Sequence, residues 1–219
     1  MKIFIATGFL VLVTALRASS VEPWVDGTRS YETVSYHELN IQGLAALDSN
    51  HEGGLRLDGG ILDHWSIQGQ WLRDDATPGA ESWEAGTQMR LGESGEWPVD
   101  LAGFAALGQI HQDDSAQSLS FSVGLILAKE VGGHSLALNL LYGSDLGLGA
   151  TLAMHSPYIW WATRLGLEAG YNSHSQSLTP QICFSLPGDI DLQCGLRISW
   201  PGNALACLLS LSYEIFPSP

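Results

Sequence analysis

The sequence lacks any apolar segment long enough for a transmembrane helix, and it is poor in basic residues. Its longest mainly apolar run, Ile3–Leu16, is shorter than the roughly 18 residues that a helical span requires. Only 9 Lys and Arg stand against 23 Asp and Glu, for a formal net charge of −14. Such a charge repels a phosphate backbone, so we expect no nucleic-acid partner.

Residue patterns for metal, nucleotide and disulfide chemistry are missing as well. The seven histidines are scattered, with no two at a ligand spacing on one strand, and no glycine-rich phosphate loop is present. The three cysteines are Cys183, Cys194 and Cys207. A three-residue loop at 187–189 would place Phe184 opposite Leu192, and a turn at Gly202-Asn203 would place Cys207 beside Ile198. This register points Cys183 inward and the other two cysteines outward, which predicts three buried free thiols. We therefore expect no cofactor, no metal site and no disulfide.

The N-terminus has the pattern of a secretory signal peptide. Lys2 precedes the apolar run, and Ala18-Ser19-Ser20 supplies small residues before Val21. We expect residues 1–20 to be removed and residues 21–35 to form a periplasmic leader. Removal takes away Lys2 and Arg17, so that 7 basic residues remain against 23 acidic ones, for a net charge of −16.

Strict alternation of apolar and polar residues runs through the C-terminal third of the chain. In 190–200, Leu192, Leu196 and Ile198 alternate with Gln193 and Arg197, and the segments 159–171 and 205–215 repeat this pattern. These segments are about eleven residues long, the length with which a tilted strand crosses a bilayer. Aromatic residues at their ends are typical of membrane interfaces. The pattern favours a membrane barrel over the alternative, a secreted soluble β-sandwich.

Counting such segments over 36–216 predicts an all-β, membrane-spanning, antiparallel up-and-down β-barrel with about 12 strands, within a range of 10 to 12. An even number returns both ends of the barrel to the periplasmic side, with 73–82 and 172–180 as the long outer loops. The facing of 101–110 stays open, because small residues dominate it. The predicted strands are 36–47, 54–62, 65–72, 83–91, 101–110, 118–128, 135–142, 146–154, 159–171, 181–186, 190–200 and 204–216.

The polar row of each strand would then line the barrel interior. As channel-lining side chains we predict Glu38, Arg56, Asp58, Gln68, Gln70, Glu84, Gln88, Arg90, Arg164, Glu168, Asp191, Gln193, Arg197 and Glu214. These residues either select solutes by charge in a water-filled pore or pair and neutralise one another across a closed structural barrel. The first hypothesis is a passive channel or transporter for a small solute in the outer membrane of a Gram-negative bacterium. The expected partners are outer-membrane lipids, lipopolysaccharide, the barrel assembly machinery and that solute.

One pair of residues raises the alternative of a barrel enzyme. His64 and Ser66 lie two residues apart, which places them on the same face of a strand, as a lipid hydrolase requires. No third group is assignable to orient the histidine, and the shared face also holds Gln68 and Gln70. We therefore expect a turn and an inner-face serine, and no enzyme.

Four segments carry a family likeness: Ile61–Ile67, Trp83–Leu91, Leu138–Gly143 and Leu165–Ala169. With them the chain resembles outer-membrane transporter barrels, including those associated with phenol-degradation pathways. The resemblance implies a barrel without catalytic residues that moves a small solute. Residues 217–219 extend beyond the usual barrel terminus at Phe216.

Overall fold

The computed structural model describes residues 38–47, 52–62, 64–74, 80–92, 98–111, 118–144, 147–160, 162–173, 175–188, 190–201 and 204–215. The predicted signal peptide and periplasmic leader lie outside the described residues, as does Phe216. No helix among the described residues is long and apolar enough to cross a membrane.

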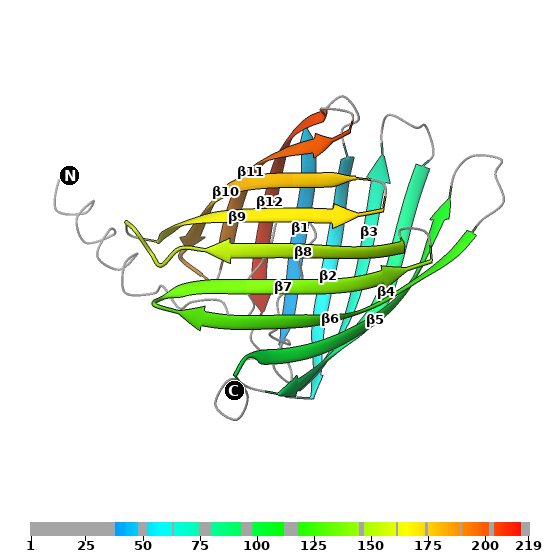
Figure 1. Cartoon of the computed structure of the whole chain (residues 1–219), viewed down its shortest axis with the longest axis horizontal. Helices are drawn as coiled ribbons and strands as arrows, with labels where there is room; N and C mark the ends of the chain where they lie inside the picture. Colours follow the sequence, from blue (N-terminus) through cyan, green and yellow to red (C-terminus); the bar gives the residue numbers. More distant parts are fainter. Residues whose placement is uncertain are drawn as a thin grey trace.

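Twelve antiparallel strands form one closed barrel, in which each strand pairs with its neighbours in sequence (Figure 1). The first and last strands pair with each other from Leu39↔Ile215 to Leu47↔Cys207, which closes the sheet. The strands are β1 Leu39–Leu47, β2 Glu52–Leu62, β3 Trp65–Asp74, β4 Ala80–Gly92, β5 Asp100–His111, β6 Ser118–Val131, β7 His134–Gly143, β8 Gly147–His155, β9 Thr163–Asn172, β10 Gln176–Leu186, β11 Ile190–Trp200 and β12 Ala204–Ile215.

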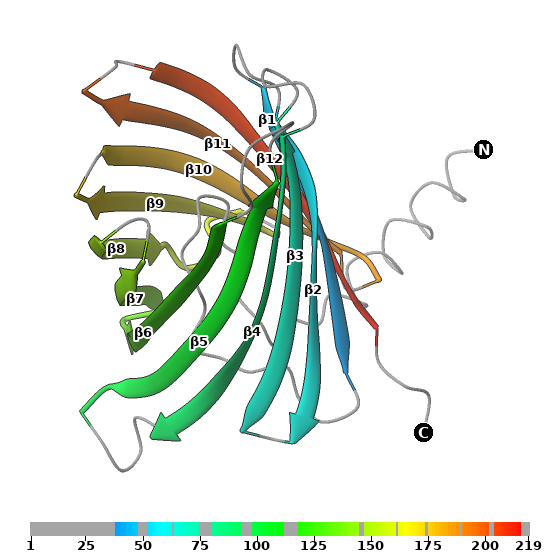
Figure 2. The same cartoon turned by 90° about the vertical axis from the view of Figure 1, so that its right-hand side faces the viewer.

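The barrel wall is a single layer, strongly curved, with β2–β5 on one side and β7–β11 on the other (Figure 2). Most strands carry large, exposed outward residues, such as Leu125 (45%), Leu152 (54%) and Leu211 (52%), whereas their neighbours in sequence are covered. A soluble protein would bury such side chains, so this surface requires a hydrocarbon surrounding. The predicted fold class and outward phase are therefore confirmed.

The strand β5, whose facing was open, points Ala102, Phe104 and Ala106 inward and Leu107 outward. Close approach explains the small residues on its partner β6. A Cβ at Gly124 would lie 2.5 Å from the Phe104 ring and 2.4 Å from the Leu140 carbonyl oxygen. Only glycine at this position lets the phenylalanine fold against the inner wall.

Three details of the predicted layout are wrong. The polar segment 172–180 is mostly strand: β10 begins at Gln176, so only 173–175 connect it to β9. The preceding strand begins at Thr163 instead of 159, and 156–159 have no regular secondary structure. The register of the last hairpin is also shifted by two residues, since Cys207 pairs with Leu196 and not with Ile198.

We call the rim where β1 begins and β12 ends the terminal rim, and the opposite one the distal rim. Seven residues separate β4 from β5, and seven separate β8 from β9, both at the rim that the strand count assigns to the periplasm. These two connections are exceptions to the expected rule of long outer loops and short periplasmic turns.

The alternation also predicts that a charged side chain at Gly166, an inward position, is less disruptive than one at the outward Leu167. Space at Gly166 is limited, because a Cβ there would lie 2.5 Å from Cγ of Gln181 and 2.6 Å from Cδ2 of His155. The inner wall at this level is already filled by neighbouring side chains.

The cost of placing a charge at different depths on the outward face tests the proposed membrane span. Leu196 lies in the middle of β11, whereas Ile215 ends β12, and both are exposed. We expect Leu196→Lys to destabilise the barrel by about 2–4 kcal/mol and Ile215→Lys by only about 0–1 kcal/mol. Unfolding by denaturant in lipid vesicles measures both values, and equal costs at the two depths would contradict the proposed span.

Candidate functional site in the barrel interior

All fourteen predicted channel-lining residues lie on the covered inner side of the wall, and none is exposed. A single-layered barrel has only two faces, so a covered row between exposed apolar residues is the interior. The fully buried members are Asp58, Gln68, Gln88, Glu168, Gln193 and Glu214. The half-buried members are Glu38, Arg56, Gln70, Glu84, Arg90, Arg164, Asp191 and Arg197.

Arg56 and Asp58 of β2 form a charged cluster with Gln68, which the register of β3 places opposite Asp58. Arg56 contacts Asp58 through two of its nitrogens: Nε lies 2.9 Å from Oδ2 and Nη2 lies 3.1 Å from Oδ1. The same Nη2 donates to Oε1 of Gln68 at 3.1 Å. This forked, charge-assisted arrangement neutralises both ions within the wall. Part of the predicted set is therefore a structural ion pair.

The seam between β1 and β12 carries further inward polar residues, which the alternation places inside the barrel although they are not in the predicted channel-lining set. Asn40 pairs in register with both Glu214 and Asp58, and Gln42 Nε2 donates to Ser210 Oγ at 2.7 Å. Both side chains are more than nine-tenths buried. Their even positions on β1 were the available signal, because they share the inward phase with Glu38.

A second buried cluster joins β8 and β10. His155 Nε2 lies 3.1 Å from Nε2 of Gln181 and 3.5 Å from Sγ of Cys183, and all three residues are buried. The sequence placed His155 in a connector, so this group was missed. Cys183 is a buried thiol as expected, but Cys194 is half-buried and Cys207 is exposed, because both point outward. The prediction of three buried thiols is thus wrong for two of them.

The inner face is not uniformly polar. Small and apolar side chains cover the inner side of β5–β8, where Phe104 and Ile126 are the largest. They pack into a small apolar cluster with Ala102, against which Leu141 also packs. One sector of the interior is therefore mainly apolar, although buried Asp100 on β5 and buried His155 on β8 also lie on it.

Several inward side chains at mid-depth are almost fully covered. Glu168, Gln193 and Asn139 are each 1% exposed, whereas Glu38, Arg164 and Asp191, near the terminal rim, are half-buried. We call Glu168, Gln193 and Asn139 the packed middle layer.

An aromatic residue of a terminal-rim connector covers one of the arginines. Tyr158 lies below the guanidinium of Arg164, whose Cζ is 4.4 Å from the ring centroid, and Arg164 Nη2 donates to the Tyr158 hydroxyl at 2.9 Å. That hydroxyl also lies 3.3 Å from Oγ of Ser185 on β10. Arg164 is therefore held at the terminal rim by stacking and hydrogen bonding together.

The residues considered for lipid hydrolysis do not form a pair. His64 is exposed in the turn between β2 and β3, whereas Ser66 is 6% exposed inside the wall. No hydrogen bond joins their side chains. Among the described residues, no group of three or more His, Cys, Asp and Glu side chains is arranged to hold a metal ion.

The fold is shared with solved outer-membrane barrels. The KdgM porin superposes with a TM-score of 0.63 at 9% identity, covering 80% of this chain and 98% of the porin. The COG4313 outer membrane channel from Pseudomonas putida F1 gives 0.57 at 14% identity, covering 89% and 100% of the two chains. Omp33 of Acinetobacter baumannii gives 0.58 at 6% identity, covering 82% and 98%.

The sequence itself matches no family model and no curated protein. At these identities the structural likeness shows the fold alone. The similar structures are channels and porins rather than enzymes, and nothing in them bears on phenol degradation. The chain is a twelve-stranded β-barrel of the outer-membrane type.

The ion pair within the wall gives a test of the inner packing. We expect Arg56→Ala to destabilise the barrel by at least about 1–3 kcal/mol, because it leaves the buried Asp58 carboxylate without its charged donors. The double variant Arg56→Ala/Asp58→Ala should recover part of this loss. Unfolding in lipid vesicles measures both, and additive costs would show that the two side chains act independently.

Proposed function

We propose that the protein is a passive outer-membrane channel for a small hydrophilic solute, with a weak preference for cations. The observation that carries this proposal is the pairing of an apolar exposed outer face with an inner face of ionisable side chains. Porin-type barrels have this distribution, since lumen side chains contact water and outer ones contact lipid. The structural likeness to channels supports it.

The charge of the inner face supports the cation preference. The predicted set contains six carboxylates and four arginines, and buried Asp100 adds another acid on the inward phase of β5. A narrow lumen does not fully screen these charges, because the Debye length is about 8–10 Å. One KdgM structure is described as a complex with oligogalacturonate, an acidic sugar chain. The excess of acids here argues against such an anion as the solute.

The packed middle layer sets the size of the solute. Side chains such as Gln193 and Glu168 leave little accessible space at mid-depth, so only a small molecule or ion would pass without rearrangement. Phe104 and Ile126 are buried, so the apolar sector packs the wall and offers no contact to a solute. The proposed link with phenol degradation therefore rests on the resemblance of the sequence alone.

The same packing favours a second candidate, a closed structural barrel. In that case the charged rows pair inside the wall, as Arg56 and Asp58 do, and no solute crosses. A twelve-stranded barrel lies between small filled barrels and open porins, so both outcomes are compatible with its diameter. Conductance decides between them.

The remaining partners are those that the location implies. An exposed apolar outer face supports contact with outer-membrane lipids, including lipopolysaccharide, and with the machinery that assembles barrels. The proposed location requires export, which the proposed signal peptide of residues 1–20 would direct. The proposed mature chain consists of a periplasmic leader, 21–35, and the barrel, 36–216. An enzyme acting through His64 and Ser66 is not proposed, because the two side chains lie apart.

Selectivity in planar bilayers tests the channel. We expect Arg197→Ala to shift the reversal potential in a salt gradient towards greater cation selectivity, because it removes a fixed positive charge from the inner face. Arg164→Ala should act in the same direction and also release Tyr158. The reversal potential of the unmodified protein should already indicate weak cation preference.

Arg73→Ala provides the control, since Arg73 is exposed near the distal end of β3 on the outward phase. It should shift the reversal potential less than Arg197→Ala does. If the unmodified protein gives no conductance steps, although its gel mobility changes on heating as for a folded barrel, the channel is refuted and the closed barrel is supported.

A further inference from the structure

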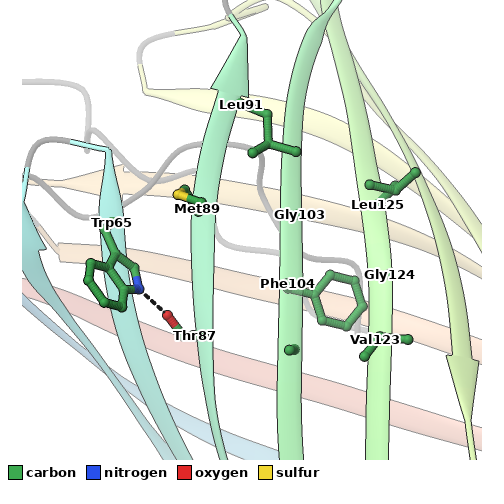
Figure 3. A pocket seen from close by; sticks show the side chains of 10 residues that line it. Trp65, Thr87, Met89, Leu91, Gly103, Phe104, Val123, Gly124 and Leu125 are labelled. Carbon is green, nitrogen blue, oxygen red and sulfur yellow. Dashed lines mark hydrogen bonds between the residues drawn. The ribbon is translucent and has the colours of Figure 1, made fainter.

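A groove lies on the outer face of the barrel over β5, with a volume of about 600 Å³ (Figure 3). Its floor consists of Gly103 and Ala105, whereas its walls are larger side chains of the two neighbouring strands. On β4 these are Met89 and Leu91, and on β6 they are Val123 and Leu125. The register aligns Met89 and Leu125 on either side of Gly103.

The groove has a dry apolar surface. Its polar side chain, Thr87, already accepts a hydrogen bond from the Trp65 indole and donates one to the Ser66 carbonyl oxygen at 3.0 Å. The same bond fixes Trp65 at one side of the groove (Figure 3). An occupant therefore needs no hydrogen-bonding groups, and a hydrocarbon chain fits this chemistry.

The small residues of β5 account for the groove. β4 and β6 are two strand spacings apart, about 10 Å, and the small residues of β5 leave the space between their side chains unfilled. Leu107 ends this space towards the distal rim. In a membrane, the side chains that line an unfilled gap lose dispersion contacts. An acyl chain lying along β5 restores these contacts.

A cation lies on β6 between the groove and the terminal rim. Lys129 follows Leu125 and Leu127 on the outward phase, about 14 Å beyond Leu125 at 3.4 Å per residue. Its ammonium donates one hydrogen bond to the Pro98 carbonyl oxygen at 2.8 Å, and an ammonium has three donors. Among the described parts of the chain, the other outward-phase cation is Arg73, near the distal rim.

We propose that this groove binds one acyl chain of an anionic phospholipid in the periplasmic leaflet, with Lys129 contacting its phosphate. The assignment rests on the proposed outer-membrane location, with the terminal rim on the periplasmic side. We assign a lipid rather than a second copy of the chain as the occupant, because the groove is continuous with the lipid-facing surface. The groove also lies beside Lys129, whose positive charge is complementary to a phosphate. The bound lipid is a fixed part of the wall over β5.

Photo-crosslinking in lipid nanodiscs tests the site, with phosphatidylglycerol that carries a diazirine in its acyl chain as the probe. We expect cross-links to concentrate on groove residues of β4 and β6, compared with Leu152 and Leu211 elsewhere on the outward face. Gly103→Leu, which fills the floor, should lower the groove cross-links at least about threefold. A Cβ at Gly103 would lie 3.4 Å from a Leu91 methyl group, so the variant should fold.

Gly69→Leu is the matched control, because Gly69 is on the outward phase of β3 and an added Cβ there meets nothing within 4 Å. It should leave the cross-links unchanged. Lys129→Ala should lower groove labelling by phosphatidylglycerol about fivefold, but not labelling by an uncharged diacylglycerol probe. This variant tests the site even if Gly103→Leu fails to fold.

Even labelling around the barrel, equal effects of the two glycine variants, or cross-links between two protein chains at the groove would each overturn the proposal. If the unmodified protein forms a heat-modifiable barrel and these results are obtained, only the groove is refuted. If it does not form such a barrel, the outer-membrane proposal is refuted together with the groove.

Discussion

Hydrogen bonding of the backbone is the constraint on which the whole structure depends. Inside hydrocarbon, every N–H and C=O group must find a partner within the protein, and a sheet satisfies this only if it has no edge. The pairing of β1 with β12 removes both edges at once. Once the sheet is closed, each residue must face either lipid or interior, and the two-residue period of the sequence follows.

Closure also explains why the two faces differ in packing. Lipid chains can adapt to the outward face, so large residues such as Leu148 and Leu205 need no close packing against other side chains there. The inward face must share a confined volume. Glycine opposite Phe104, the crowded neighbours of Gly166 and the tight cluster around His155 all result from this confinement. The polar groups inside are therefore both the wall of a candidate channel and the packing of a core.

Most of the fold was predictable from the sequence because alternation fixes the phase of each strand. The register Phe184↔Leu192 was also predictable, since the short turn at 187–189 sets it. Alternation fails where residues are small or polar on both faces. Thus the facing of β5 stayed open, and the start of β10, with its mixed polar residues, was taken for a loop. Contacts such as that of Cys183 on β10 with His155 on β8, or that of Arg164 with Tyr158 in a connector, depend on side-chain conformation, which no spacing encodes.

Pro180 lies within β10 and interrupts the ladder to β11 without shifting its register: pairing runs from Leu178↔Ile198 to Gln181↔Gly195 and omits the two residues between. Proline has no N–H to donate, so a β11 carbonyl facing it lacks that bond. The β10–β11 contact is thereby weakened locally at this depth. Amides next to Pro180 should exchange with solvent sooner than those of continuous ladders, so that one proline makes a short stretch of the wall easier to open.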